Sequence, residues 1–141
     1  MALDWSKIEF FKREEWVTDP DKVHPDVVYL MDEMRKVAGR PIIIHVAWEP
    51  AGHVEGSAHY LGLAVDFHFS GWPLLDQWLF VERFPWEGIG VYPHWNTPGL
   101  HVDLYRNKPF RDGRRWWRDV KGKYRAIDRT LLGMLLAGSS K

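Results

Sequence analysis

A histidine and an aspartate seven positions apart, His59 and Asp66, lie in the stretch that most restricts how this chain can fold, residues 56–69 (GSAHYLGLAVDFHF). Asp66 stands in an alternating apolar run, which predicts a β-strand with the aspartate on its polar face. Gly62 permits a tight or left-handed turn before the strand, and Ala64 leaves space beside Asp66. Imidazole and carboxylate groups are good ligands for a divalent metal such as zinc. The stretch therefore predicts two metal ligands, although a lone pair of this kind is also compatible with a loop histidine and a solvated strand aspartate.

A second alternating segment, residues 99–105 (GLHVDLY), predicts a strand whose polar face matches that of the first. His101 and Asp103 fall on this polar face. If the two strands are neighbours in one sheet, His101 projects beside Asp66, and the loop before the first strand adds His59. Three protein ligands leave a coordination position for water, which distinguishes a catalytic zinc site from a structural one.

The remaining pattern predicts an α+β fold in which a small, mainly antiparallel sheet is flanked by helices. Apolar residues recur at helical spacing between Pro25 and Gly39, two residues that suit the start and the end of a helix. The β-branched run at residues 42–46 predicts a buried strand. Residues 86–93 predict another strand, with close backbone approaches at its two glycines.

Two further helices are expected, one opening at Pro73 and one over residues 126–138. The apolar face of the first is predicted to comprise Leu74 or Leu75, Trp78 and Leu79. No linker or repeat divides the chain, so we expect one domain over residues 1–141.

Composition excludes several classes of protein. The 19 basic and 19 acidic residues balance, so global charge gives no support to nucleic-acid binding. The absence of cysteine excludes disulfides and thiolate ligands, which restricts a metal site to histidines and carboxylates. No long apolar run predicts a membrane span, and the charged N-terminal segment lacks the apolar core of a signal peptide. These features fit synthesis in the cytoplasm with release to the periplasm or cell wall.

Five residues, Ser57, His59, Gly62, Ala64 and Asp66, together match the pattern S-x-H-x-x-G-x-A-x-D. With the downstream GLHVD, the chain resembles the zinc D-alanyl-D-alanine carboxypeptidase family. That family includes bacteriophage endolysins that cut the L-alanyl-D-glutamate bond, and it shares its fold with the hedgehog signalling domain. The likeness covers most of the chain, because the flanking segments also occur in the order seen in small family members.

The resemblance implies a hedgehog/DD-peptidase-like fold and a zinc site formed by His59, Asp66 and His101. It also implies a zinc metallopeptidase that hydrolyses amide bonds in peptidoglycan stem peptides, of the D-Ala-D-Ala carboxypeptidase or L-Ala-D-Glu endopeptidase type. We expect a monomer with a stem peptide as its partner and no nucleic acid.

Two departures from the family pattern affect the step from metal site to enzyme. Many members have an arginine that holds a substrate carboxylate shortly after the strand that corresponds to residues 42–46, and here Trp48 lies near that place. Several relatives also have an acidic residue three positions before the last ligand, where this chain has Pro98. Asp103 is therefore the first candidate for the catalytic base, and an equally supported interpretation is that it orients His101.

Other polar residues near the motif have alternative interpretations. His68 shares the side of Asp66 and is a candidate for an alternate ligand or a supporting group. Ser57 is expected to fix the loop through backbone hydrogen bonds rather than to act as a nucleophile. Surface positions are expected for three groups that loops could bring near the metal, namely Glu49, Glu55 and His94. Hydrogen-bonded structural histidines are expected at His45 and His53.

The C-terminal third contains a basic and aromatic patch, which we interpret as a solvated face with its tryptophans packed inward. Its members are Arg111, Arg114, Arg115, Arg118, Lys121, Lys123 and Arg125, with Trp116 and Trp117 among them. The functional alternative is contact with an anionic cell-wall polymer. For the whole protein, the alternatives to a peptidase are a catalytically inactive metal-binding module, for example in a phage particle, and, with little support, a DNA-associated protein.

Overall fold

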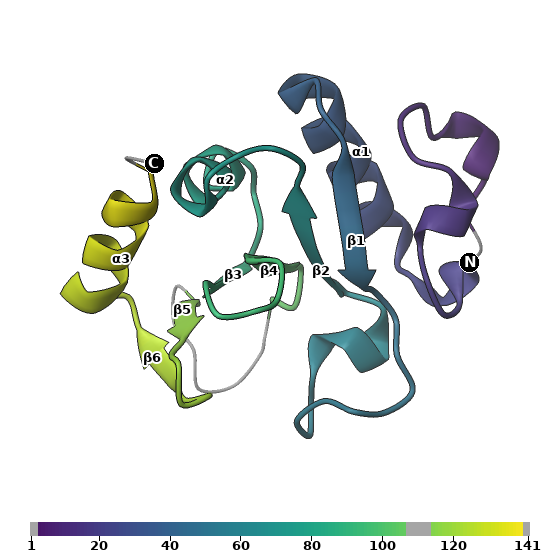
Figure 1. Ribbon diagram of the computed structural model, residues 1–141. Coiled ribbons are helices and arrows are strands. Elements are labelled where there is room, and N and C mark those ends of the chain that lie inside the picture. Colours follow the sequence, from purple (N-terminus) through teal and green to yellow (C-terminus); the bar gives the residue numbers. More distant parts are fainter. Residues whose placement is uncertain (1–2, 107–113, 140–141) are drawn as a thin grey trace.

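The protein has an α+β architecture in the computed structural model, which describes residues 3–106 and 114–139. Within these residues six strands form one sheet, in the order β1-β2-β4-β3-β5-β6 (Figure 1). The neighbouring strands pair antiparallel except β3 and β5, which are parallel. The strands are β1 (Ile42–Val46), β2 (Ala64–Phe69), β3 (Gly88–Tyr92), β4 (Gly99–Asp103), β5 (Arg115–Arg118) and β6 (Tyr124–Ala126). The α+β class and the mainly antiparallel sheet are confirmed.

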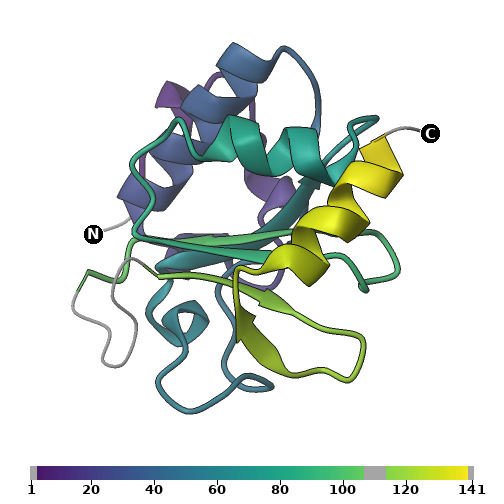
Figure 2. The same ribbon diagram turned by 90° about the vertical axis from the view of Figure 1, so that its left-hand side faces the viewer.

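Three α-helices in the described part of the chain lie on one side of this sheet, and Figure 2 shows the loop that follows β1 on the other side. The helices are α1 (Pro25–Ala38), α2 (Leu74–Val81) and α3 (Arg129–Ser139). Short 3-10 helices precede α1 and β2, namely η1 (Trp5–Lys7), η2 (Arg13–Glu15), η3 (Pro20–Lys22) and η4 (Ala58–Leu61). Within residues 3–106 and 114–139, no helix has the length and hydropathy needed to cross a bilayer.

Helix α1 begins and ends where its sequence predicts. The His24 imidazole caps it by accepting a hydrogen bond from the Asp26 backbone N–H, and Pro25 occupies the first turn. Gly39 ends it in the left-handed conformation, with φ 66°. Four of its apolar residues, Val27, Val28, Met31 and Met34, are fully buried.

Alternation along β2 assigns one face to the core and the other to the site. Val65, Phe67 and Phe69 are at most 1% exposed and pack in the core between the sheet and the helices. Asp66 projects to the opposite face, which carries the loop after β1. The helices thus stabilise the sheet from one side and leave the other for a functional site.

One detail of the predicted elements is wrong. Leu79 is 57% exposed instead of lying on the apolar face of α2, because Gln77 occupies a buried position. The Gln77 side chain accepts from the Phe69 backbone N–H and donates to the Trp72 carbonyl, so both its amide oxygen and its amide nitrogen have a hydrogen-bond partner in this buried position. The basic C-terminal patch contains the strands β5 and β6. Among its described members the two tryptophans are buried and most basic side chains are exposed, as expected, with Arg114 as the buried exception.

Candidate metal centre

Strand pairing places Asp66 and His101 side by side. They are direct partners in the antiparallel pairing of β2 with β4, as the sequence predicts for neighbouring strands. The same row continues through Gly90 on β3 to Trp116 on β5. Gly90 has no side chain, and a Cβ atom there would meet the indole of Trp116 at 2.5 Å. The indole therefore crosses Gly90 and packs against His101, with ring centroids 5.2 Å apart.

His59 comes from η4, whose two ends are fixed by Ser57 and Gly62. The Ser57 hydroxyl accepts a hydrogen bond from the His59 backbone N–H at 3.2 Å, which is the loop-fixing role predicted for it. Gly62 ends η4 with φ 69°, and a Cβ atom there would overlap the backbone carbonyl of Lys22. Both the turn and the close approach therefore require glycine at this position.

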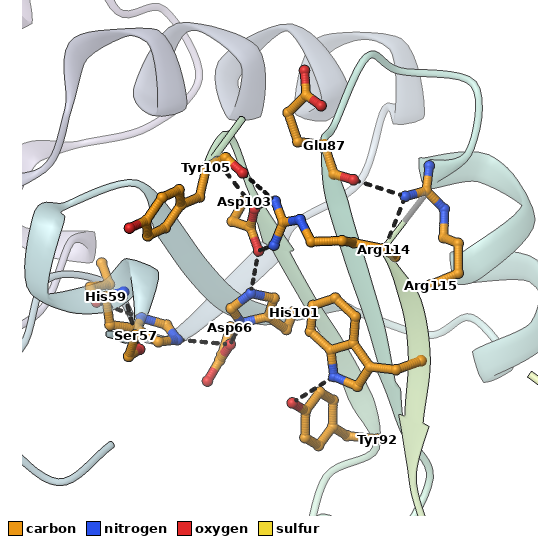
Figure 3. A network of polar contacts seen from close by, with 12 residues as sticks. Ser57, His59, Asp66, Glu87, Tyr92, His101, Asp103, Tyr105, Arg114 and Arg115 are labelled. Atoms are coloured by element: carbon orange, nitrogen blue, oxygen red, sulfur yellow. Dashed lines mark hydrogen bonds and ion pairs between the residues drawn. The ribbon is translucent and has the colours of Figure 1, made fainter. Parts of the chain in front are cut away.

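The three predicted ligands converge on one point (Figure 3). One ligand atom from each of His59, Asp66 and His101 lies within 4.8 Å of the other two. Oδ1 of Asp66 is 3.2 Å from Nε2 of His59 and 2.9 Å from Nδ1 of His101. This group can hold a metal ion.

Hydrogen bonds at the far side of each imidazole orient the rings. Nδ1 of His59 lies 2.7 Å from the carbonyl oxygen of Ala47, and Nε2 of His101 lies 2.8 Å from Oδ2 of Asp103. Because both acceptors need a donor, these two nitrogens carry a proton in either charge state of the rings. The remaining nitrogens face Asp66. When protonated they donate to its carboxylate, and in the neutral rings they offer lone pairs to a metal ion, as in metal-ligating histidines.

The site is electron-rich, and the pKa values of its groups respond to this. Burial raises the pKa of the Asp66 carboxyl, but hydrogen bonds with His101 and His59 outweigh burial and hold the pKa below its usual value. Burial lowers the pKa of His101, but the hydrogen bonds with Asp103 and Asp66 outweigh it and raise the pKa to about 9. Positive charge is therefore favoured between the three groups, whether a proton or a metal ion supplies it.

Asp103 lies behind His101, away from the metal ligand atoms (Figure 3). Its side chain is fully buried and forms a two-pronged ion pair with Arg114, whose side chain is 4% exposed. Arg114 also donates to the carbonyl of Tyr105 at 2.7 Å. Gly88 makes room for the pair, because a Cβ atom there would meet Oδ2 of Asp103 at 2.5 Å. This geometry supports the orienting interpretation of Asp103, and its role as catalytic base stays a prediction.

A pocket of about 350 Å³ opens over the three ligands. Its described lining includes the ligands themselves, Ser57, and residues from the loops and from β3, β5 and β6, among them His53, Tyr92, Trp95, Trp116, Arg118 and Tyr124. The His53 ring stacks on His59 with centroids 4.3 Å apart, and Tyr92 stacks on Trp95 at 4.2 Å. The metal ligands thus lie at the base of an aromatic pocket.

No protein-family model matches the chain, and no curated protein or solved structure is detectably similar to it.

Several residues considered from sequence lie elsewhere. His68 is not in the ligand group, because its Nδ1 is 2.6 Å from Nε2 of His45. Trp48 donates to the Tyr60 carbonyl and lies under the ammonium group of Lys22. The described lining of the ligand pocket does not include Glu49, Glu55 or His94.

Sequence reasoning missed the two arginines that bear on the site. Arg114 was grouped with a solvated patch, but it is buried beside Asp103. Period-two alternation in Arg115–Arg118 was the available signal, since Trp117 is buried in the core while Trp116 and Arg118 line the pocket. Arg111, from the same patch, lies outside the described residues.

Proposed function

We propose that this protein is a zinc-dependent peptidase that hydrolyses amide bonds in peptidoglycan stem peptides. The convergence of His59, Asp66 and His101 at the base of an open pocket is the observation that carries the proposal. The resemblance of the motif to zinc D-alanyl-D-alanine carboxypeptidases supplies the substrate class and the hedgehog/DD-peptidase-like fold.

The donor set fits zinc. Two neutral imidazoles and one carboxylate are ligands of catalytic zinc sites, whereas magnesium and calcium prefer oxygen ligands alone. The nitrogens that face the carboxylate are the ones left for a metal ion, because Ala47 and Asp103 hold the opposite nitrogens. Zinc in such a site supplies Lewis-acid polarisation of an amide carbonyl and activation of water.

The chain's own residues hold and shape this site. Asp103 and Arg114 fix the His101 ring from behind, and the Ala47 carbonyl fixes the His59 ring. Trp95 and Trp116 offer apolar surface to a peptide in the pocket. Asp103 stays the predicted catalytic base. Its contacts with His101 and Arg114 directly support a role in positioning His101.

One observation favours the alternative, a catalytically inactive metal-binding module of the same fold. Among the described residues that line the ligand pocket, Asp66 is the single carboxylate. A peptidase needs a group that takes a proton from water, and acidic residues commonly do so. The module would bind metal at the same three ligands and cut no peptide.

One experiment separates these alternatives. The purified protein is assayed for bound metal by mass spectrometry and for release of peptide fragments from peptidoglycan and from model muropeptides. We expect about one zinc per chain and fragments whose masses identify the cut bond. Asp66→Ala and His101→Ala should abolish both binding and release.

The matched control is His68→Ala, which removes an imidazole from the same face of β2 but outside the ligand group. It should retain zinc and activity. Zinc binding without fragment release would replace the peptidase with the module, and full release by Asp66→Ala would exclude this metal centre.

A further inference from the structure

A second charged group, Arg118, faces the pocket that contains the metal ligands. It lies on β5 two residues after Trp116, so both side chains project from the same face of the sheet. The pairing of Val91 with Trp117 places Arg118 in the row next to Tyr92. Arg118, Tyr92 and Asp66 all line the pocket.

The guanidinium of Arg118 has no acidic partner within the described part of the chain. The acid next to it in sequence, Asp119, accepts from the backbone N–H groups of Lys121 and Lys123 and pairs with Arg125 at 3.8 Å. Arg118 is therefore a cation without a counter-ion at the edge of a pocket whose described lining holds one carboxylate, Asp66. That carboxylate belongs to the metal ligand group.

Two contacts orient Arg118 before a ligand arrives. Nε donates to the carbonyl of Gly122 at 3.1 Å, and the guanidinium lies over the ring of Tyr124, 5.2 Å from its centroid. Gly122 adopts φ 80° in the turn between β5 and β6, which brings its carbonyl within reach of this strand. Within the described part of the chain these contacts engage Nε and one face of the group, so the terminal amino groups are available to a ligand. A guanidinium held in this way loses less conformational entropy on binding.

We propose that Arg118 binds a carboxylate of the substrate, which makes acidic peptides the substrate class of this pocket. The inference rests on the proposed peptidase function, because it assigns a specificity residue to that same site. Arginine is suited to this role, since its planar fork forms two parallel hydrogen bonds with a carboxylate. Trp48 lies near the place where many members of the family that the chain resembles have a carboxylate-binding arginine, and here it lies under Lys22. An arginine on β5 can supply that carboxylate contact from another side of the pocket.

The test compares two peptides on three proteins. The acidic probe is L-Ala-γ-D-Glu-L-Lys-D-Ala-D-Ala, and the neutralised probe is the same peptide with both free carboxyl groups converted to carboxamides. The proteins are the zinc-loaded wild type, Arg118→Gln and the control Lys121→Gln. The control removes one positive charge from the same hairpin at an exposed position outside this pocket.

We expect Arg118→Gln to raise the KM for the acidic probe about ten- to a hundredfold with kcat nearly unchanged. The same variant should treat the neutralised probe as the wild type does, and Arg118→Lys should restore part of the binding. Lys121→Gln should match the wild type with both probes. Calorimetric binding of the acidic probe gives a second readout that does not require cleavage.

The outcomes separate the two proposals. Cleavage by the wild type with equal KM values for the wild type and Arg118→Gln would overturn the role of Arg118 and leave the peptidase standing. Binding without cleavage, lost in Arg118→Gln, would overturn the peptidase and keep the carboxylate site. Failure of the wild type to bind or cut the acidic probe would overturn the inference.

Discussion

Each imidazole of the candidate metal centre has two nitrogens with different tasks. One nitrogen donates to a fixed acceptor of the protein, the Ala47 carbonyl for His59 and the Asp103 carboxylate for His101. The other faces Asp66 and, in the neutral ring, offers its lone pair to a metal ion. Because the acceptors fix both the proton position and the ring orientation, the ligands are oriented without a metal ion.

The first prediction concerns the buried pair of Asp103 and Arg114. Asp103→Asn leaves Arg114 buried without its counter-ion while an oxygen can still accept from His101. We expect the free energy of unfolding of the zinc-free protein at pH 7 to fall by about 3 kcal/mol. Zinc affinity should also fall, by about 10- to 100-fold, because His101 is less firmly held. Urea unfolding and competitive zinc titration measure the two effects.

The loss of stability caused by Asp103→Asn should become smaller as the pH falls. Burial raises the pKa of the Asp103 carboxyl, but the hydrogen bond and charge of His101 and the contact with Arg114 outweigh it and hold the pKa well below its usual value. A carboxyl whose pKa is lower in the folded state stabilises the fold above the unfolded-state pKa, about 3.9, and stabilises it less as the pH falls below that value. The difference between wild type and variant should therefore narrow below about pH 4.

Glu33→Gln is the control for this prediction, because Glu33 is exposed on α1. It should leave the free energy of unfolding within about 0.5 kcal/mol of the wild type at pH 7. If Asp103→Asn has the same free energy of unfolding as the wild type at pH 7, the buried pair does not contribute to stability as predicted.

At the scale of elements, strong local signals in the sequence were sufficient to predict individual strands and helices. Elements that depend on long-range strand pairing were not predicted. Strands β2 and β4 and helix α1 were predictable, because alternation, a proline start and a glycine end mark them in the sequence. The convergence of His59, Asp66 and His101 followed from the alternation of the two strands and from the motif, and their role as metal ligands stays a prediction. β5 was not predictable, since its pairing is parallel to β3, a strand that ends more than twenty residues earlier. The burial of Arg114 depends on that pairing, so the sequence alone placed it on a solvated surface. Arg118 is exposed, as expected, but its position beside the pocket also depends on that pairing.

The second prediction tests Gly90, one of the two glycines of β3 whose close approaches the sequence indicated. Gly90→Ala introduces a methyl group 2.5 Å from the Trp116 indole, which must move from its place against His101. We expect a loss of about 1–3 kcal/mol in the free energy of unfolding and weaker zinc binding. Thermal unfolding and zinc titration are the measurements.

Gly133→Ala provides the matched control on α3. A Cβ atom there meets nothing within 4 Å, and the glycine lies inside a helix. This change should increase the free energy of unfolding by about 0.5–1 kcal/mol, since alanine loses less backbone entropy than glycine in a helix. Equal effects of the two substitutions would show that Gly90 is not required to make room for Trp116.

At the scale of the whole molecule, the candidate centre connects parts of the fold that are otherwise separate. Asp66 and His101 belong to the sheet, whereas His59 belongs to η4 in the loop on the face opposite the helices (Figure 2). A bound ion therefore links the loop to the central strands. Ligation should stabilise the whole fold and order this loop in particular.

The last prediction is the effect of adding or removing metal. Free zinc at about 100 times its dissociation constant adds about 2.7 kcal/mol to the free energy of unfolding, which corresponds to a rise of about 10 °C in Tm for a chain of this size. Chelation should reverse the rise, and magnesium should not reproduce it, because it prefers oxygen ligands. His59→Ala should remove most of the rise while leaving the two strand ligands in place. Hydrogen exchange should show zinc-dependent protection in residues 47–63 of the wild type and not of this variant. Identical melting curves with and without zinc would contradict a metal centre formed by these three residues, because binding to the folded state alone must raise its stability.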